Sequence, residues 1–248
     1  MNQTGNTILI TGGGSGIGQA LAHRLHDAGN HVIVTGRRRE ALGQAIAGRP
    51  RMSAYVLDVT AADAVAAFAR QLLAEYPRLN ILVNNAGVYS AEKIAAGRDL
   101  SDALRMIETN LVAPIRMIDA FIEHLGAQSG AAIINVSSGL AFVPFPAAPT
   151  YSATRAAIHA YTAALRPLLK DRVELIEIVP PQVQTELTPG QSKGPNSMPL
   201  DAFADEVMAL LQAAVTPAEV CVEGVRYFRE AEAKGQYDEA LAMLATYS

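Results

Sequence analysis

The sequence predicts an α/β protein, built as one doubly wound domain around a mostly parallel sheet of about seven strands with helices on both faces. Three observations predict it. Short apolar runs alternate with segments of helical spacing along the 248 residues, which is the pattern of right-handed βαβ units. A glycine-rich turn joins the first apolar run to the first helix, and no linker or internal repeat divides the chain.

The apolar runs give the expected strands in order. Most should be buried inside the sheet, and the last should be a short strand at its edge. They cover residues 7–10, 31–35, 54–57, 81–83, 132–136, 174–179 and, at the edge, 218–222. Helical spacing covers residues 19–28, 61–76, 100–125, 151–170, 200–214 and 227–247, the last with a break near Gly235.

The first predicted strand runs into a loop that reads TGGGSGIG, from Thr11 to Gly18, and a helix follows at once. Glycines let a ligand approach the backbone, and a helix N-terminus offers unpaired N–H groups and a favourable dipole to a phosphate. This order favours a nucleotide-binding loop. The spacing GxxxGxG differs from the common GxGxxG dinucleotide fingerprint, and a tight turn between strand and helix is the structural alternative.

The end of the second predicted strand indicates which nucleotide binds. Proteins that prefer NAD usually carry an acidic side chain there, which bonds the ribose 2′-hydroxyl. This chain has Gly36 followed by Arg37, Arg38 and Arg39 instead. Because arginine pairs well with phosphate, the sequence favours NADP(H), with NAD(H) still possible. A solvated basic helix start is the alternative, and one of the three arginines fits it.

Polar residues also follow the third and fourth predicted strands. Asp58 ends the third strand, and the turn Asn84-Asn85-Ala86-Gly87 ends the fourth. Both fall at carboxyl ends of strands, which form the rim where open α/β sheets bind ligands. Asn and Gly tolerate positive φ, so an ordinary turn is the alternative explanation of the second motif.

Pro114 lies inside the helix expected over residues 100–125. Proline has no N–H to donate to the carbonyl of Asn110, four residues earlier, so the helix should kink and leave that carbonyl free. Water can satisfy the carbonyl, as in any proline kink. Alternatively, the carbonyl is an acceptor built for an active-site water, and the sequence leaves both interpretations open.

The stretch from Ser137 to Arg155 follows the fifth predicted strand. Tyr151 and Arg155 are four residues apart, so a helix would place the phenol and the guanidinium on one face. A neighbouring cation favours the phenolate, which makes Tyr151 a candidate acid/base group. The Ser138 hydroxyl could orient a carbonyl substrate toward it. A buried tyrosine beside a surface arginine is the structural alternative.

Composition narrows the class of protein. Half of the residues are hydrophobic and 18% are charged, with a net charge of −4, which suits a globular core and argues against an electrostatic nucleic-acid binder. The single Cys221, the absence of a long apolar run and the lack of a signal pattern at the N-terminus predict a cytoplasmic protein with no membrane partner. No metal site is expected, because no ligand pattern such as HExxH is formed by the five histidines, His23, His26, His31, His124 and His159.

In these motifs, the chain resembles the short-chain dehydrogenase/reductase family from residue 7 to about residue 222. TGGGSGIG, NNAG, Asn110, Ser138 and Tyr151 stand in the family's order and at its usual spacing. The run 135–145 and the PPxVxTxLTPGQ segment starting at Pro180 resemble the DltE-like branch, whose substrates are poorly defined. The resemblance implies a Rossmann-type fold, a carbonyl reductase or alcohol dehydrogenase activity with NADP(H), and a homodimer or homotetramer.

The resemblance also implies a role for each motif residue. The implied catalytic residues are Asn110, which keeps a water relay in place, Ser138, which positions the substrate oxygen, Tyr151, which passes the proton, and Arg155. The implied cofactor contacts are Gly12, Ser15, Gly16, Ile17 and Gly18 at the phosphates, Arg37 with Arg38 as a second candidate at the 2′-phosphate, Asp58 and Val59 at the adenine, Asn85 and Gly87 at the ribose, Val183 and Thr185 at the nicotinamide amide, and Tyr151 and Arg155.

The chain departs from the family pattern at two places. The proline–glycine pair after the sixth strand is Pro180-Pro181 here, as in the DltE-like branch. The family motif YxxxK is Tyr151-Ser-Ala-Thr-Arg155 here. In the family the lysine bonds the nicotinamide ribose and joins the proton relay. Arginine keeps the charge but effectively cannot give up a proton, so the electrostatic role can survive while relay through residue 155 cannot.

Two functions from different classes therefore stay open. The leading hypothesis is an NADP(H)-dependent oxidoreductase that uses Tyr151 as general acid/base; the alternative is a nucleotide-binding pseudoenzyme, acting as a sensor or scaffold, because Arg155 replaces the relay lysine. A metal-dependent hydrolase has little support. Residues 1–135 should form mainly the cofactor half and 136–248 the catalytic half. The loop 142–150 should form a stiff apolar pocket wall, and residues 186–199 should be a mobile loop or lid.

Overall fold

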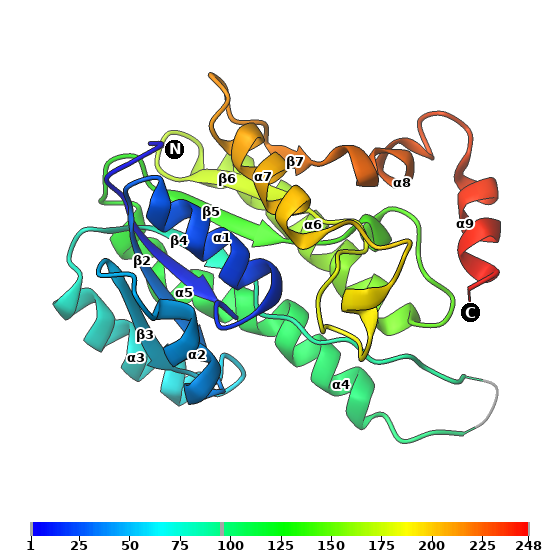
Figure 1. Ribbon diagram of the computed structural model, residues 1–248, viewed down its shortest axis with the longest axis horizontal. Coiled ribbons are helices and arrows are strands. Elements are labelled where there is room, and N and C mark those ends of the chain that lie inside the picture. Colours follow the sequence, from blue (N-terminus) through cyan, green and yellow to red (C-terminus); the bar gives the residue numbers. More distant parts are fainter. Residues whose placement is uncertain (1, 95–96, 248) are drawn as a thin grey trace.

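The computed structural model describes residues 2–94 and 97–247, and in this part of the chain seven strands form one sheet in the order β3-β2-β1-β4-β5-β6-β7 (Figure 1). Every neighbouring pair is parallel. The strands are β1 (Thr7–Thr11), β2 (His31–Gly36), β3 (Met52–Val56), β4 (Leu79–Asn84), β5 (Ala132–Val136), β6 (Glu174–Val179) and β7 (Glu219–Cys221). The doubly wound fold and the edge strand expected near residue 220 are confirmed, and the strand order reverses between β1 and β4.

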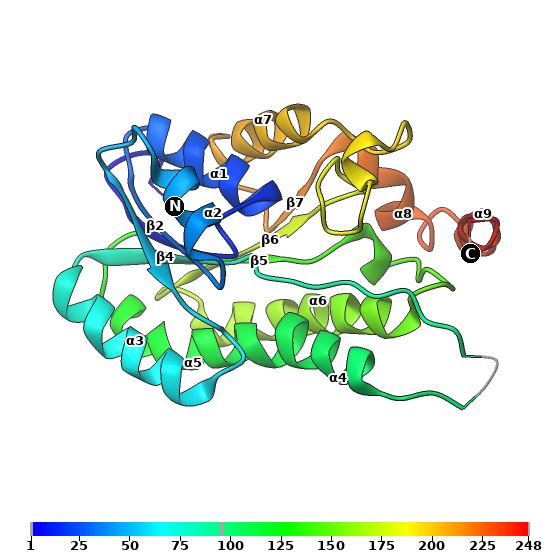
Figure 2. The ribbon, with the colours of Figure 1, turned by 60° about the horizontal axis from the view of Figure 1, so that its bottom comes forward.

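Helices cover both faces of the sheet (Figure 2). One layer contains α1 (Gly16–Asp27) and α7 (Leu200–Leu211), which pack against each other; the other contains α3 (Ala62–Glu75), α5 (Ala113–Leu125) and α6 (Pro149–Leu169). The remaining helices are α2 (Arg39–Ile46), α4 (Ser101–Ile107), α8 (Arg226–Glu230) and α9 (Tyr237–Ala245). No helix of the described ranges is both long enough and apolar enough to cross a membrane.

Each inner strand is buried on both sides, which explains why the strands are continuous apolar runs. Successive side chains of a strand point to opposite faces. Ile8 and Ile10 of β1 therefore join the core under α1 and α7, which includes Phe203, while Leu9 joins the core under α3 and α5, which includes Phe121. The two cores hold the sheet between the helical layers and place all strand ends along one edge.

The helix expected over residues 100–125 is interrupted. A π-helical turn, η1 (Glu108–Val112), separates α4 from α5, and Pro114 stands in the first turn of α5. The proline has no N–H to donate to the carbonyl four residues earlier, and a single π-helical turn, a rare form of helix, lies directly before α5. The kink was predicted, but its form as a π-helical turn was not.

The C-terminal segment is broken near Gly235, as the sequence predicts. The helix predicted over 227–247 is α8 and α9, joined by a turn in which Gly235 has a φ of 67°, a left-handed conformation that favours glycine. The helix α2 begins at Arg39, so this arginine fits the alternative of a solvated basic helix start. Residues 1 and 248, the expected ends of the domain, lie outside the described residues.

Candidate active site

The loop between β1 and α1 is shaped for close approach of a ligand. Gly12 has a φ of 68°, and a Cβ built on it would lie 2.9 Å from the Cα of Ala86. A Cβ on Gly18 would lie 2.4 Å from the Gly12 carbonyl oxygen. Within the described chain, α1 has no acidic residue in its first turn and no side-chain cap from Ser15. No capping or acidic side chain of α1 therefore competes with a phosphate for its first N–H groups.

The turn after β4 holds this loop in place. The Thr11 hydroxyl oxygen accepts hydrogen bonds from the backbone N–H groups of Asn85 and Ala86, each 3.1 Å long. The Asn85 side chain donates to the carbonyls of Thr11 at 3.0 Å and Gly12 at 3.2 Å. The Asn-Asn-Ala-Gly turn thus supports the glycine loop through uncharged hydrogen bonds between side chains and backbone groups.

The arginines after β2 lie in different places. Arg38 donates to the Ser15 hydroxyl at 3.1 Å, so its guanidinium lies over the glycine loop. The charge of Arg37 reaches Asp58. Burial raises the pKa of Asp58, but hydrogen bonds from Thr60 and the charge of Arg37 outweigh it, so this pKa lies below its usual value. Arg39 is the first residue of α2 and is exposed. The structure places Arg37 and Arg38, but not Arg39, beside predicted cofactor contacts.

Tyr151 and Arg155 lie together in the first turns of α6, as the spacing predicts. Both are 6% exposed, and the guanidinium carbon of Arg155 lies 4.8 Å from the centre of the Tyr151 ring. Arg155 Nη1 donates to the Val136 carbonyl at the end of β5, at 3.1 Å. Its Nε is buried and finds no hydrogen-bond partner in the described part of the chain. Arg155 is therefore not a surface residue, and its guanidinium stacks on the Tyr151 ring.

Gly87 and Asn110 complete this cluster. A Cβ built on Gly87 would lie 2.4 Å from Arg155 Nη2 and 3.4 Å from Asn110 Oδ1. Asn110 Oδ1 accepts from the Val88 N–H at 2.8 Å, and its Nδ2 donates to the Val88 carbonyl at 2.9 Å and to the Thr154 hydroxyl at 3.3 Å. The missing side chain at Gly87 makes room for the guanidinium, and Asn110 fixes the segment that follows β4.

Ser138 and the residues after β6 lie on adjoining segments. Ser138 caps the short helix η2 (Gly139–Ala141), where its hydroxyl oxygen accepts from the Leu140 N–H at 3.1 Å, and η2 packs on α6. Val183 is 2% exposed, and the Thr185 methyl would lie 3.4 Å from a Cβ on Gly16. The structure thus brings the segment after β6 against the glycine loop.

Of the two loops expected to border the site, 142–150 fits the prediction only in part, and nothing tests the mobility expected of 186–199. Within 142–150, Phe145 packs near Tyr151, but Phe142 lies against His159 and Val143 packs with Ala240 of α9. Only part of this loop is therefore a wall of the site. In the loop 186–199, the two ends are joined, because residues 182 and 184 form backbone hydrogen bonds with Met198. Its expected mobility stays a prediction.

Two residues near the site were not foreseen. Tyr89 packs edge-on against Tyr151, with ring centres 5.1 Å apart, and burial, with the nearby Tyr151 and Glu92, raises its pKa. The Glu92 carboxylate accepts from the Thr150 N–H at 2.6 Å and hydroxyl at 2.7 Å, at the start of α6. The segment 88–100 has no periodic pattern, so the sequence carries no signal that could have found them.

The sequence profile of the family described as short chain dehydrogenase matches residues 6–196. A protein of Bacillus subtilis (strain 168), named "Uncharacterized oxidoreductase DltE", is 43% identical over 189 residues, which are 75% of this chain and 75% of that protein. The chain belongs to the short-chain dehydrogenase/reductase family and is an oxidoreductase of that family. Within it, the chain falls in the DltE-like branch, as its Pro180-Pro181 segment predicts.

Two other proteins are similar to this chain. Sulfoacetaldehyde reductase 2 of Chromohalobacter salexigens is 36% identical over 186 residues, which are 73% of this chain and 74% of that protein. The crystal structure of a short chain dehydrogenase from Burkholderia cenocepacia J2315 in complex with NADP superposes with a TM-score of 0.82 at 27% identity, covering 97% of this chain and 98% of that one.

Proposed function

We propose that this protein is an NADP(H)-dependent reductase or dehydrogenase that interconverts a carbonyl compound and an alcohol, with Tyr151 as general acid/base. The observation that carries the proposal is the cluster of Tyr151, Arg155, Gly87 and Asn110, buried at the same edge of the sheet as the glycine loop. A buried phenol beside a fixed cation is suited to exchange a proton with a substrate oxygen.

The residues at this edge fit a dinucleotide. The proposed contacts are Gly12, Ser15, Gly16, Ile17 and Gly18 at the phosphates, Asp58 and Val59 at the adenine, Asn85, Gly87, Tyr151 and Arg155 at the ribose, and Val183 and Thr185 at the nicotinamide. The nicotinamide, when bound, supplies or accepts the hydride. Arg37 and Arg38 support the phosphorylated form, since β2 is followed by cations where a 2′-hydroxyl would need an acceptor.

The proposed proton chemistry uses the chain's own groups. Ser138 orients the carbonyl oxygen toward the Tyr151 hydroxyl, which donates its proton during reduction and accepts it during oxidation. Arg155 balances the phenolate charge by stacking on the ring and is held there by the Val136 carbonyl. Because a guanidinium keeps its proton, relay to solvent would run through water at Asn110.

The side chains packed around Tyr151 support an uncharged, largely apolar substrate. They include Tyr89, Met106, Leu140 and Phe145. The sulfoacetaldehyde reductases have an anionic substrate in their names. Here Arg155 already contacts the Tyr151 ring and the Val136 carbonyl, and Arg98 and Arg105 are paired with Glu92 and Asp102. We therefore propose an apolar aldehyde or ketone.

The pseudoenzyme alternative keeps one specific support, the replacement of the relay lysine by Arg155. One experiment separates the two functions. The purified protein is tested with NADPH and NADH on a panel of apolar aldehydes and ketones, and cofactor binding is measured in parallel by fluorescence. Turnover with NADPH supports the enzyme. Tight NADPH binding with no turnover on any carbonyl, in either direction, supports the sensor or scaffold.

A further inference from the structure

A row of polar side chains crosses four neighbouring strands in register. Asn84 of β4 pairs with Asn135 of β5, Asn135 with Glu177 of β6, and Glu177 with Glu219 of β7. Residues in register on neighbouring strands share one face of the sheet. Asn84 is 6% exposed, and Asn135 and Glu177 are fully buried. Buried polar groups require partners, and here three of the partners come from α6.

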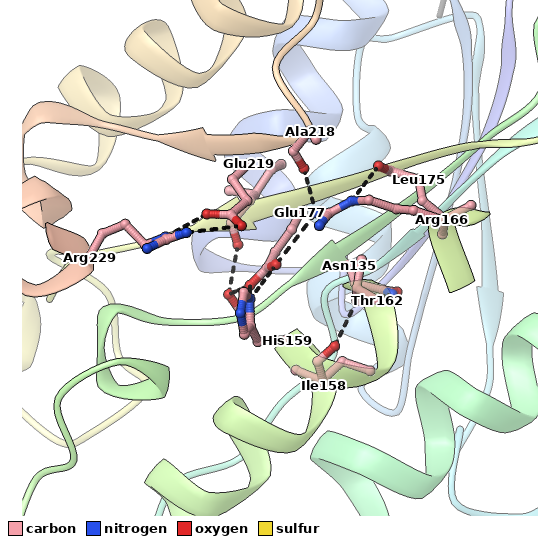
Figure 3. Close-up of polar contacts among 12 residues, drawn as sticks. Asn135, Ile158, His159, Thr162, Arg166, Leu175, Glu177, Ala218, Glu219 and Arg229 are labelled. Atoms are coloured by element: carbon pink, nitrogen blue, oxygen red, sulfur yellow. Dashed lines mark hydrogen bonds and ion pairs between the residues drawn. The ribbon is translucent and has the colours of Figure 1, made fainter. Parts of the chain in front are cut away.

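Three residues of α6 meet this row. The Thr162 hydroxyl accepts from Asn135 Nδ2 at 2.8 Å, His159 Nδ1 lies 2.8 Å from Glu177 Oε2, and Arg166 Nη2 lies 3.8 Å from the same oxygen (Figure 3). Their spacing of three and four residues puts them on one face of the helix, the face that also carries Tyr151 and Arg155. We call this contact between α6 and the sheet the polar seam: Asn84, Asn135, Glu177 and Glu219 with His159, Thr162 and Arg166.

Charges in the polar seam are balanced from every side. Glu177 and Glu219 stand next to each other, an arrangement that is unfavourable without counter-charges. Arg229 of α8 binds Glu219 at 2.6 Å (Figure 3). A carboxylate only accepts, so His159 Nδ1 carries the proton it shares with Glu177. That hydrogen bond, outweighing burial, raises the pKa of His159, and Glu219 raises it further while Arg229 lowers it.

The surroundings of His159 contain one more titratable group. Burial, with the charge of Glu219, raises the pKa of Cys221 on β7 to about 11, so the thiol stays neutral. His159, Glu177 and Glu219 have ligand atoms within 4.8 Å of one another, as a metal site would. Arg166 and Arg229 already neutralise the two carboxylates, so we interpret the cluster as an ion-pair network.

Glu177 also reaches the other side of the active site. The Ser137 hydroxyl donates to Glu177 Oε1 at 2.5 Å, and Ser137 directly precedes Ser138. His159 stands two turns after Tyr151 on the same helix face. One carboxylate therefore ties the backbone that carries Ser138 to the helix that carries Tyr151 and Arg155. If α6 slipped or rotated, a buried charge would lose its partners, which is strongly unfavourable.

We propose that Glu177 is a positioning residue, whose carboxylate holds Ser137 and His159 together and so sets the distance between Ser138 and Tyr151. The inference rests on the proposed function, because it assigns Ser138 and Tyr151 to one reaction. It requires the ionised form of the Glu177–His159 pair. His159 has a raised pKa, so the ion pair is complete below the ordinary histidine value and is lost as pH rises through the raised one.

The test uses Glu177→Gln, His159→Gln and the double variant. Glu177→Gln keeps the shape but removes the charge, and we expect kcat to fall by about 10- to 100-fold, the effect of a small misplacement of catalytic groups. The Kd for NADPH should change little, because Glu177 lies on β6, away from the glycine loop that follows β1. In the wild type, kcat should decline on the alkaline side as His159 loses its proton, and His159→Gln should remove that limb. The double variant should be no slower than the slower single variant.

The matched control is Asn30→Ala. Asn30 is also fully buried in a polar cluster, with bonds to Asn6 and Leu25, but it lies at the opposite edge of the sheet. It should lower the melting temperature and leave kcat unchanged. A Glu177→Gln variant with wild-type kcat and pH profile, or single effects that multiply in the double variant, would overturn the proposal.

A second measurement separates this inference from the proposed function. Crystal structures of the NADPH complexes of wild type and Glu177→Gln give the distance between Ser138 Oγ and the Tyr151 hydroxyl without any turnover. We expect that distance to change by about 1 Å, the displacement that matters for catalysis. An unchanged distance would contradict the positioning role even in a protein that reduces no carbonyl, while a changed distance without turnover would leave the positioning role intact and refute the reductase.

Discussion

The two halves of the binding edge hold their polar groups by different means. At β1 and β4, the glycine loop is fixed by uncharged hydrogen bonds between backbone groups and the side chains of Thr11 and Asn85, with no ion pair among them. At β5 to β7, the support of Tyr151 comes from charged side chains, above all Glu177 and His159. The first half is shaped by backbone geometry and leaves N–H groups free for a ligand. The second is shaped by charge pairs that already have partners.

This difference predicts opposite sensitivities. A loop held by backbone geometry and uncharged hydrogen bonds tolerates a change of charge nearby. It does not tolerate an added side-chain atom, because backbone and side-chain atoms already fill the space beside Gly12 and Gly18. A contact held by ion pairs tolerates changes in the shape of the surrounding side chains. It does not tolerate the loss of one partner, which leaves a buried charge unpaired. The predictions below test this contrast, starting with the reacting group itself.

The largest effect should come from Tyr151→Phe. The ring that Arg155 stacks on is kept, so the fold and the Kd for NADPH should not change, but the only acid/base group proposed for the substrate oxygen is lost. We expect kcat to fall by about 10²- to 10⁴-fold, the usual contribution of such a group. Tyr161→Phe, on the same helix but packed in the core under α3 and α5, is the control and should keep wild-type kcat. An active Tyr151→Phe enzyme would remove Tyr151 from the mechanism.

The next largest effect should be on cofactor choice. Arg37→Ala and Arg38→Ala each remove a cation from the loop after β2, and we expect the Kd for NADPH to rise by about 10- to 100-fold, the loss of a charged hydrogen bond. The Kd for NADH should hardly change, because it lacks the 2′-phosphate. Arg39→Ala is the matched control on the same loop. Equal losses for both cofactors would contradict the preference for NADP(H).

The space beside Arg155 can be tested by adding a side chain at Gly87, which lies next to its guanidinium. Gly87→Ala puts a methyl group within 2.4 Å of Arg155 Nη2, which should displace the guanidinium from the Tyr151 ring and lower kcat by about 10-fold, in the range of overpacking costs. Lysine has no second terminal nitrogen, so the same change should cost less in the R155K background. Gly43→Ala, where a Cβ meets open space, is the control. Equal costs in both backgrounds would show that Gly87 does not serve the arginine.

The contrast also explains what the sequence could predict. The glycine loop, the strand ends and the pair Tyr151 and Arg155 are local patterns, since their residues stand within a few positions of each other. Strand positions follow from apolar runs that two helical layers bury. The sequence predicts these features, and the family resemblance assigns a role to each of them.

Other features depend on partners that are distant in the chain. Glu92 caps α6 through Thr150, 58 positions away, and Glu177 meets His159 across 18 positions. A single glutamate or histidine in a sequence gives no sign of such a partner. The π-helical turn before α5 was equally hidden, because Pro114 predicts a kink but not which hydrogen-bond pattern absorbs it. His159 therefore looked like one more structural or solvated histidine.

The smallest predicted effect concerns Glu92, the charged support on the cofactor side of α6. Burial opposes its ionisation, but hydrogen bonds from Thr150 and Arg98 outweigh that and lower its pKa. The stabilisation is therefore present above the unfolded pKa of a glutamate and is lost as pH falls through the lower folded value. Glu92→Gln should reduce the free energy of unfolding by about 1–3 kcal/mol at neutral pH, with a smaller difference in acid, measured by urea unfolding across pH. Glu230→Gln, which breaks a surface pair with Lys234, should change stability little at any pH. If both variants behaved alike, the start of α6 would not depend on charge. Support by ion pairs would then be limited to the polar seam and would not extend to the start of α6.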